Sequence, residues 1–94
     1  MRAPSTGAPA ADLYAAALEM CAFAEQHGCA RVLVCEHHGI DDGYLPSPMT
    51  LATAIAARTT TLPIMIGVVL LPLYDPIRLA EDMAVLDLIS KGRV

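Results

Sequence analysis

The sequence predicts an α/β fold with a parallel sheet, in the order helix, strand, helix, strand, helix. Two short runs of continuous apolar residues indicate strands, and three stretches with apolar residues at helical spacing indicate helices. At two of the helix starts a capping residue is followed directly by proline. Strands that alternate with helices pair in parallel through right-handed crossovers, so about two βα units are expected.

The first part of the chain is predicted to hold one helix and one strand. Asp12 is suited to cap the helix, and Gly28 supplies its C-terminal stop. The strand at 31–36 is apolar on successive positions, as expected when both faces of a parallel strand are covered. Residues 1–12 are predicted to be a disordered lead, so the domain is expected to span 13–94.

The second part repeats this pattern. Ser47 followed by Pro48 predicts the start of a second helix, and Asp75 followed by Pro76 predicts the start of a third. Between them, residues 64–71 form a β-branched apolar run that Pro72 ends, which predicts the second strand.

Composition indicates that this chain is a segment of something larger. Of its 94 residues, 55% are hydrophobic, 17% charged and 4% aromatic, which is more aliphatic surface than a small domain needs. Two parallel strands also leave unpaired backbone groups along both edges of their sheet. We therefore expect faces that meet further strands or a partner.

Charge and hydropathy exclude several classes of protein. The net charge is -4 and the six basic residues are scattered, which disfavours nucleic-acid binding. The longest apolar run is about 13 residues and holds two prolines, whereas a membrane helix needs ~20. No secretory signal is visible, and three cysteines without a CxxC spacing fit a reducing cytoplasm. A cytoplasmic protein is expected, with Cys21, Cys29 and Cys35 as small buried hydrophobes.

The sequence Glu36-His37-His38 is the strongest candidate for chemistry, because it follows the first strand directly. Consecutive strand residues point to opposite faces, so these three side chains are not expected to converge on one metal ion. A histidine here is either a polar strand-end residue bonded to the backbone or a general base that titrates near neutral pH.

Three neighbouring features have weaker functional readings. Cys35 is expected to be inert, because burial in an apolar strand raises a thiol pKa. Asp41 and Asp42 precede glycine, which is typical of a turn. Gly67 interrupts the second strand and marks either a close approach of ligand or backbone, or close packing of a neighbouring element.

The ordered set of motifs resembles the luciferase-like flavin-dependent monooxygenases. The resemblance runs from about residue 13 to the last residue and rests on five stretches: Glu36-His37-His38, residues 42–48, residues 67–72, residues 75–82 and residues 86–93. Single pieces such as an Asp-Pro helix start are common, but their order and separation are specific.

This resemblance implies a TIM-type (β/α)8 barrel, reduced FMN or deazaflavin F420 as cofactor, a small organic substrate and frequent dimers. His37 is implied to be the active-site base. Gly67 and Val68 are implied to form a non-prolyl cis peptide against the flavin ring.

A complete barrel needs about 250 residues. The chain is therefore expected to be an N-terminal fragment of about a quarter of a barrel, without the flavin phosphate site and inactive alone. Two alternatives stay open. The chain could be a non-catalytic partner subunit of a full-length homologue, or a fragment of a metal-dependent hydrolase that uses His37 and Glu36.

Overall fold

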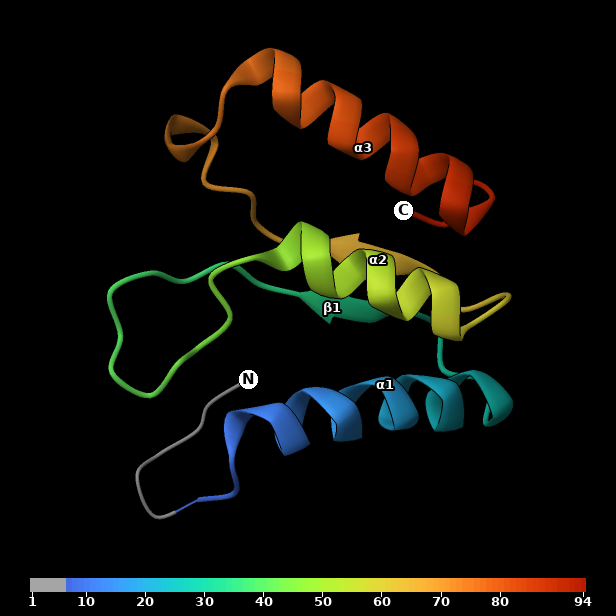
Figure 1. Cartoon of the computed structure of the whole chain (residues 1–94). Helices are drawn as coiled ribbons and strands as arrows, with labels where there is room; N and C mark the ends of the chain where they lie inside the picture. The colour runs from blue at the N-terminus through green and yellow to red at the C-terminus, as the bar shows by residue number, and fades with distance from the viewer. Residues whose placement is uncertain (1–6) are drawn as a thin grey trace.

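A computed structural model describes residues 7–94 and has the predicted order of elements (Figure 1). Residues 1–6 of the predicted lead lie outside the described residues. The helices and strands are α1 (Ala10–Gln26), β1 (Val32–Val34), α2 (Pro48–Arg58), β2 (Ile64–Ile66), the 3-10 turn η1 (Leu71–Leu73) and α3 (Pro76–Ser90). No helix in 7–94 is long and apolar enough to cross a membrane.

Helix α1 begins earlier than predicted. Ala10 and the next two residues, assigned to the disordered lead, are helical, and Pro9 instead of Asp12 stands at the N-cap. Alanine has the highest helix propensity, and the backbone N–H groups of Asp12 and Leu13 both donate to the Pro9 carbonyl. The two later starts are confirmed at Pro48 and Pro76.

The two strands pair in parallel, with Leu33 opposite Met65 in the register. Both are shorter than the predicted 31–36 and 64–71. The backbone N–H of Gly67 donates to the Val34 carbonyl at 2.8 Å, and beyond this bond the two segments are joined through the Glu36 side chain and no longer by backbone ladder bonds. An extended ladder needs a partner at every second residue, so the strands end where that partner is lost.

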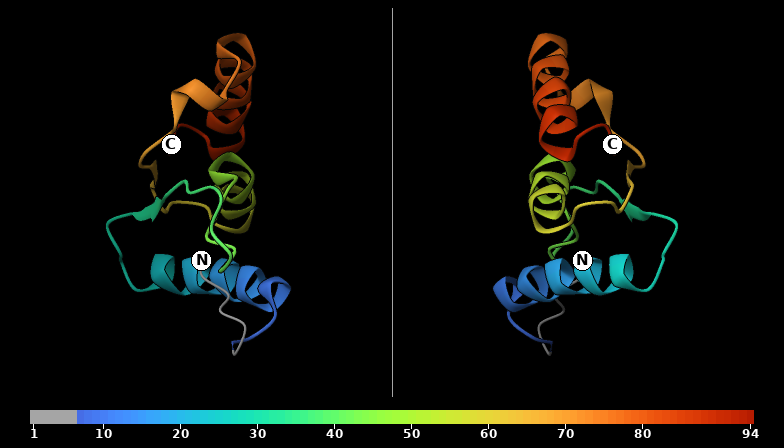
Figure 2. Two further views of the ribbon diagram at one scale, coloured as in Figure 1. Left: turned by 90° about the vertical axis from the view of Figure 1, so that its left-hand side faces the viewer. Right: turned by 90° about the vertical axis from the view of Figure 1, so that its right-hand side faces the viewer.

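One face of the strand pair is covered and the other is open. Helix α2 packs on both strands, with α1 and α3 on either side of it, so the helices and strands form two layers (Figure 2). The core lies between α2 and the strands, where Val34, Ile55 and Ile64 are buried. On the opposite face Leu33 is 55% and Met65 47% exposed. We refer to this uncovered side of the strands as the open face.

The amino ends of the strands are closed by two charged side chains. The Glu25 carboxylate accepts the backbone N–H groups of Thr60, Thr61 and Leu62, and these bonds, with that of Thr61 largest, lower its pKa to about 2. The Arg93 guanidinium donates to the carbonyls of three residues that end α2 or lead into β2: Ala56, Thr59 and Leu62. These contacts tie α1, α2 and the end of α3 together.

The chain after α3 bonds the edge of β2. The backbone N–H of Ile64 donates to the Arg93 carbonyl at 2.8 Å. Neighbouring residues of a strand direct their backbone groups to opposite edges, so this bond lies on the edge of β2 away from β1. Arg93 thus occupies the position in which a third parallel strand would begin.

The prediction that the three cysteines are buried is only partly right. Cys21 is buried, but Cys35 is half-buried and Cys29 is exposed, so the cysteines are not uniformly core residues. Cys29 lies in the loop between α1 and β1, where no described segment covers it.

Candidate functional site at the carboxyl ends of the strands

The loops that follow β1 and β2 lie at the same edge of the sheet, on the left in Figure 1. Parallel strands bring their carboxyl ends together, and α/β proteins place reactive groups at this edge. The loop at 35–47 carries Glu36-His37-His38, and the loop at 67–75 carries Gly67 and Val68.

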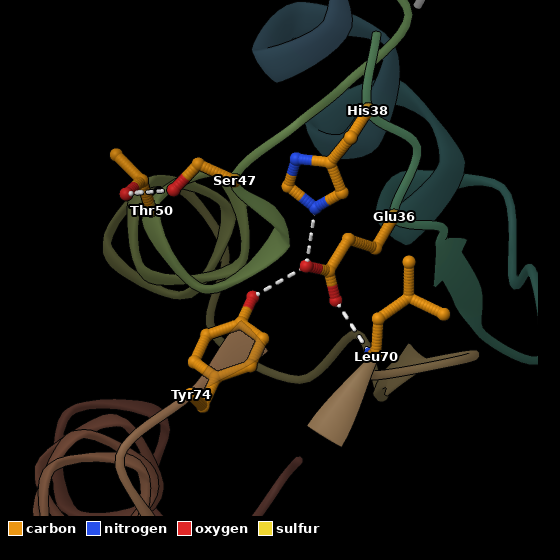
Figure 3. Close-up of polar contacts among 6 residues, drawn as sticks. All are labelled: Glu36, His38, Ser47, Thr50, Leu70 and Tyr74. Atoms are coloured by element: carbon orange, nitrogen blue, oxygen red, sulfur yellow. Dashed lines mark hydrogen bonds and ion pairs between the residues drawn. The ribbon is translucent and has the colours of Figure 1, made fainter. Parts of the chain in front are cut away.

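A buried carboxylate organises this edge (Figure 3). The Glu36 side chain is 1% exposed. Its Oε1 accepts hydrogen bonds from His38 Nε2 at 2.7 Å and from the Tyr74 hydroxyl at 2.9 Å. Its Oε2 accepts the backbone N–H of Leu70 at 2.8 Å. One side chain at the end of β1 therefore holds two positions of the loop that follows β2.

Glu36 is ionised in this setting. Burial would raise the pKa of its carboxyl, but the hydrogen bonds from Leu70, His38 and Tyr74 together outweigh burial and hold the pKa below its usual value. Burial, followed by the bond to Glu36 and its charge, raises the pKa of Tyr74 to about 12. At neutral pH an acceptor-only carboxylate therefore faces a protonated phenol.

His37 lies apart from this network, as the alternation of strand residues predicts. Its backbone N–H donates to the Leu45 carbonyl at 2.9 Å, and its ring packs on Tyr44 with centroids 4.1 Å apart. Ring atom Nδ1 is buried without a hydrogen-bond partner within residues 7–94. A buried polar atom without a hydrogen-bond partner is rare. The His37 ring therefore lacks the hydrogen bond that a purely structural role would provide.

Gly67 and Val68 lie where the open face meets this edge. The peptide bond between them is cis, as the resemblance implies. A Cβ on Gly67 would lie 2.9 Å from Cδ1 of Leu33, so the glycine accommodates a side chain of the neighbouring strand. Val68 is 64% exposed and adds an apolar surface beside Leu33.

The loop between His38 and α2 contains turn chemistry. Asp42 Oδ1 accepts the backbone N–H of Tyr44 at 3.1 Å, which confirms the turn predicted at Asp41-Asp42-Gly43. Ser47 precedes α2 but bonds the Thr50 hydroxyl at 2.8 Å and caps no backbone N–H (Figure 3). Within residues 7–94 no three His, Cys, Asp or Glu side chains are grouped to hold a metal ion.

Sequence reasoning missed the central role of Glu36. Glutamate directly after an apolar strand was a signal for a buried charge, but its partners are not readable from sequence. Leu70 and Tyr74 lie 34 and 38 residues further along the chain, and only the parallel pairing of β1 and β2 brings them to Glu36.

Comparisons with known proteins point to one family. A family model described as luciferase-like monooxygenase matches residues 2–94. The oxygenase component of a flavin-dependent trigonelline monooxygenase from Acinetobacter baylyi is 32% identical over 87% of this chain and 23% of its own length. This chain therefore spans about a quarter of that relative.

Solved structures agree with the fold. The crystal structure of monooxygenase RslO1 from Streptomyces bottropensis has a TM-score of 0.85 and 35% identity, over 90% of this chain and 26% of that one. The oxygenating constituent of 3,6-diketocamphane monooxygenase from Pseudomonas putida, solved with FMN, also has a TM-score of 0.85, at 25% identity over 95% and 24%. The predicted α/β fold, part of a TIM-type barrel, is confirmed.

Proposed function

Because the chain belongs to the luciferase-like monooxygenase family, we propose that it forms part of a flavin-dependent monooxygenase that acts with reduced flavin on a small organic substrate. The observation that carries this proposal is the meeting of an open apolar face with the carboxyl edge of the strands. His37 lies in the loop that follows β1 and Val68 in the loop that follows β2, and both loops are at this edge of the sheet.

The residues present fit a flat, largely apolar ring system. Leu33, Met65 and Val68 offer exposed apolar surface, and the Leu33 side chain occupies the space where Gly67 lacks a Cβ. FMN is favoured over deazaflavin F420 because a structure of similar fold was solved with FMN. When bound, the reduced flavin would supply the reaction with oxygen.

In this proposal the chain positions the flavin ring and supplies the group that accepts a proton. Gly67 and Val68 form a platform for one face of the flavin. His37 acts as the general base and accepts a proton at Nε2, because Nδ1 is shut away from solvent. Tyr44 holds the imidazole by packing against it, with the ring planes inclined by 33°.

We further propose that the 94-residue chain is inactive alone. Within residues 7–94, β1 has a strand partner on one edge only, and no helix or strand covers Leu33 and Met65 on the open face. A flavin against this face would remain in contact with water on its other side, whereas monooxygenase chemistry requires a site from which water is excluded.

A two-polypeptide reconstitution tests the proposal. The chain is mixed with a polypeptide that carries the remaining three quarters of the Streptomyces bottropensis relative, and FMN fluorescence and substrate oxidation are measured. We expect saturable FMN binding and turnover from the mixture, and neither from the chain alone.

Two outcomes would contradict this account. A stoichiometric complex that binds FMN but has no activity would favour the non-catalytic subunit, and tight FMN binding by the chain alone would overturn the proposed inactivity. Stoichiometric zinc in the purified chain would instead support the metal-dependent hydrolase.

A further inference from the structure

We propose that Glu36 is a positioning residue with two effects: it fixes the tautomer of His38, and it ties residues 67–74 to the end of β1. Only the consequence for catalysis rests on the proposed function. Both structural effects follow from the hydrogen bonds of the chain itself.

The tautomer of His38 follows from the hydrogen-bond donors that contact the Glu36 carboxylate. The Leu70 backbone N–H is a donor under all conditions, and the Tyr74 hydroxyl keeps its proton at neutral pH. An ionised carboxylate has no proton to give, so the 2.7 Å contact with His38 requires a proton on Nε2. In the neutral imidazole, Nδ1 is then the acceptor.

This tautomer gives His38 a defined chemical capacity. The His38 side chain is 41% exposed whereas that of Glu36 is buried, so the carboxylate holds the ring at Nε2 and leaves Nδ1 as the nitrogen that it does not bind (Figure 3). The site thus holds a second proton acceptor next in sequence to His37, and only His38 has a carboxylate partner.

The same carboxylate sets the place of Val68. Leu70 and Tyr74 stand at the two flanks of η1, and Glu36 binds both, which fixes the turn as a unit (Figure 3). Val68 is two residues before Leu70, so a release of the Leu70 N–H frees the segment that carries Val68 on the open face.

An amide cannot reproduce this arrangement. Glutamine offers one oxygen acceptor and one NH2 donor, whereas the site presents three donors to two acceptor oxygens. In Glu36→Gln at least one donor therefore faces the NH2 group. If the NH2 group faces His38, that ring must accept at Nε2 and carry its proton on Nδ1.

Nitrogen-15 NMR of the histidine rings in the flavin-free chain tests the tautomer at about pH 8, where an unperturbed histidine is neutral. We expect wild-type His38 to show a protonated Nε2 and an unprotonated Nδ1. In Glu36→Gln we expect the tautomer preference to be lost where the NH2 group faces His38. Where it faces the Leu70 N–H we expect amide exchange in 67–75 to be at least tenfold faster.

Glu25→Gln is the matched control, because Glu25 is also a carboxylate that accepts backbone N–H groups, but at the amino ends of the strands. It should leave the His38 tautomer unchanged. Tyr74→Phe removes one donor only, so exchange at Leu70 should accelerate while the tautomer is kept, and this variant serves if Glu36→Gln does not fold.

Two results would overturn the inference. One is a wild-type His38 with its proton on Nδ1 or with both tautomers populated, as in an unfolded chain. The other is a Glu25→Gln variant that changes the tautomer as much as Glu36→Gln does. Since no flavin is present, either result would leave the proposed monooxygenase function to be judged by the reconstitution.

Discussion

The two ends of the strand pair use charged side chains in opposite ways. At the amino ends, Glu25 and Arg93 bind backbone groups from neighbouring segments, and their contacts are structural. At the carboxyl ends, Glu36 binds one backbone group but also a tyrosine and an exposed histidine. His37 beside it has a buried ring nitrogen without a partner.

The charged side chains that bind backbone groups and the carboxylate that binds titratable side chains thus lie at opposite ends of the strands. Backbone groups that bind a fixed charge stabilise the fold, and no proton is exchanged in the process. A carboxylate that binds titratable side chains can orient and polarise them. In barrel enzymes the carboxyl ends of the strands carry the active site and the amino ends carry stability. In this chain Glu25 and Arg93 lie at the amino ends, and Glu36 and His38 lie at the carboxyl ends.

Loss of Arg93 should have the largest effect on stability. Arg93→Ala leaves the carbonyls of Ala56, Thr59 and Leu62 without this donor, and we expect a loss of about 3 kcal/mol in the free energy of unfolding. Urea denaturation measures it. Arg78→Ala is the control, because its ion pair with Asp82 is exposed and worth about 0.5 kcal/mol. Equal losses in the two variants would remove the special role of the amino end.

Loss of His37 should affect turnover and leave stability nearly unchanged. In the reconstituted protein we expect His37→Ala to lower kcat by roughly 100-fold or more, because general bases contribute about that much. The control is His27→Ala, whose ring bonds the Phe23 carbonyl at the opposite end of the strands. An unchanged kcat in His37→Ala would exclude His37 as the base.

Acid should weaken the amino end through Glu25, which is the smallest expected effect. Its pKa falls from 4.5 in the unfolded chain to about 2 in the fold, so its contribution is complete above pH 4.5 and is lost as pH falls towards 2. Glu36, whose pKa is also lowered, acts in the same direction.

Urea denaturation at a series of pH values should therefore show a flatter acid limb for Glu25→Gln than for the wild type. The exposed Asp12, whose carboxylate accepts no backbone N–H within residues 7–94, provides the control variant Asp12→Asn. Identical acid limbs in wild type and Glu25→Gln would show that these backbone bonds do not persist in solution.

The local sequence determined the type and order of the elements. Asp75 followed by proline predicted the start of α3, and its carboxylate accepts the N–H groups of Ile77 and Arg78 as a cap should. Continuous apolar runs predicted two parallel strands, although the burial of both faces that they also predicted is wrong for 7–94, where Leu33 and Met65 are exposed. Asp41-Asp42-Gly43 predicted a turn. These features depend on neighbours in the chain, so propensity and spacing are sufficient to predict them.

Only the tertiary structure decided where the strands end, which face stays open and what Glu36 does. The strands stop after the paired residues Val34 and Ile66, and α1 starts at Ala10, before the capping residue Asp12 that the sequence predicted. The position of Glu36 after a strand is set by the sequence and does not depend on how the strands pair. Glu36 becomes the centre of a site because parallel pairing brings Leu70 and Tyr74 within hydrogen-bond distance of its buried carboxylate.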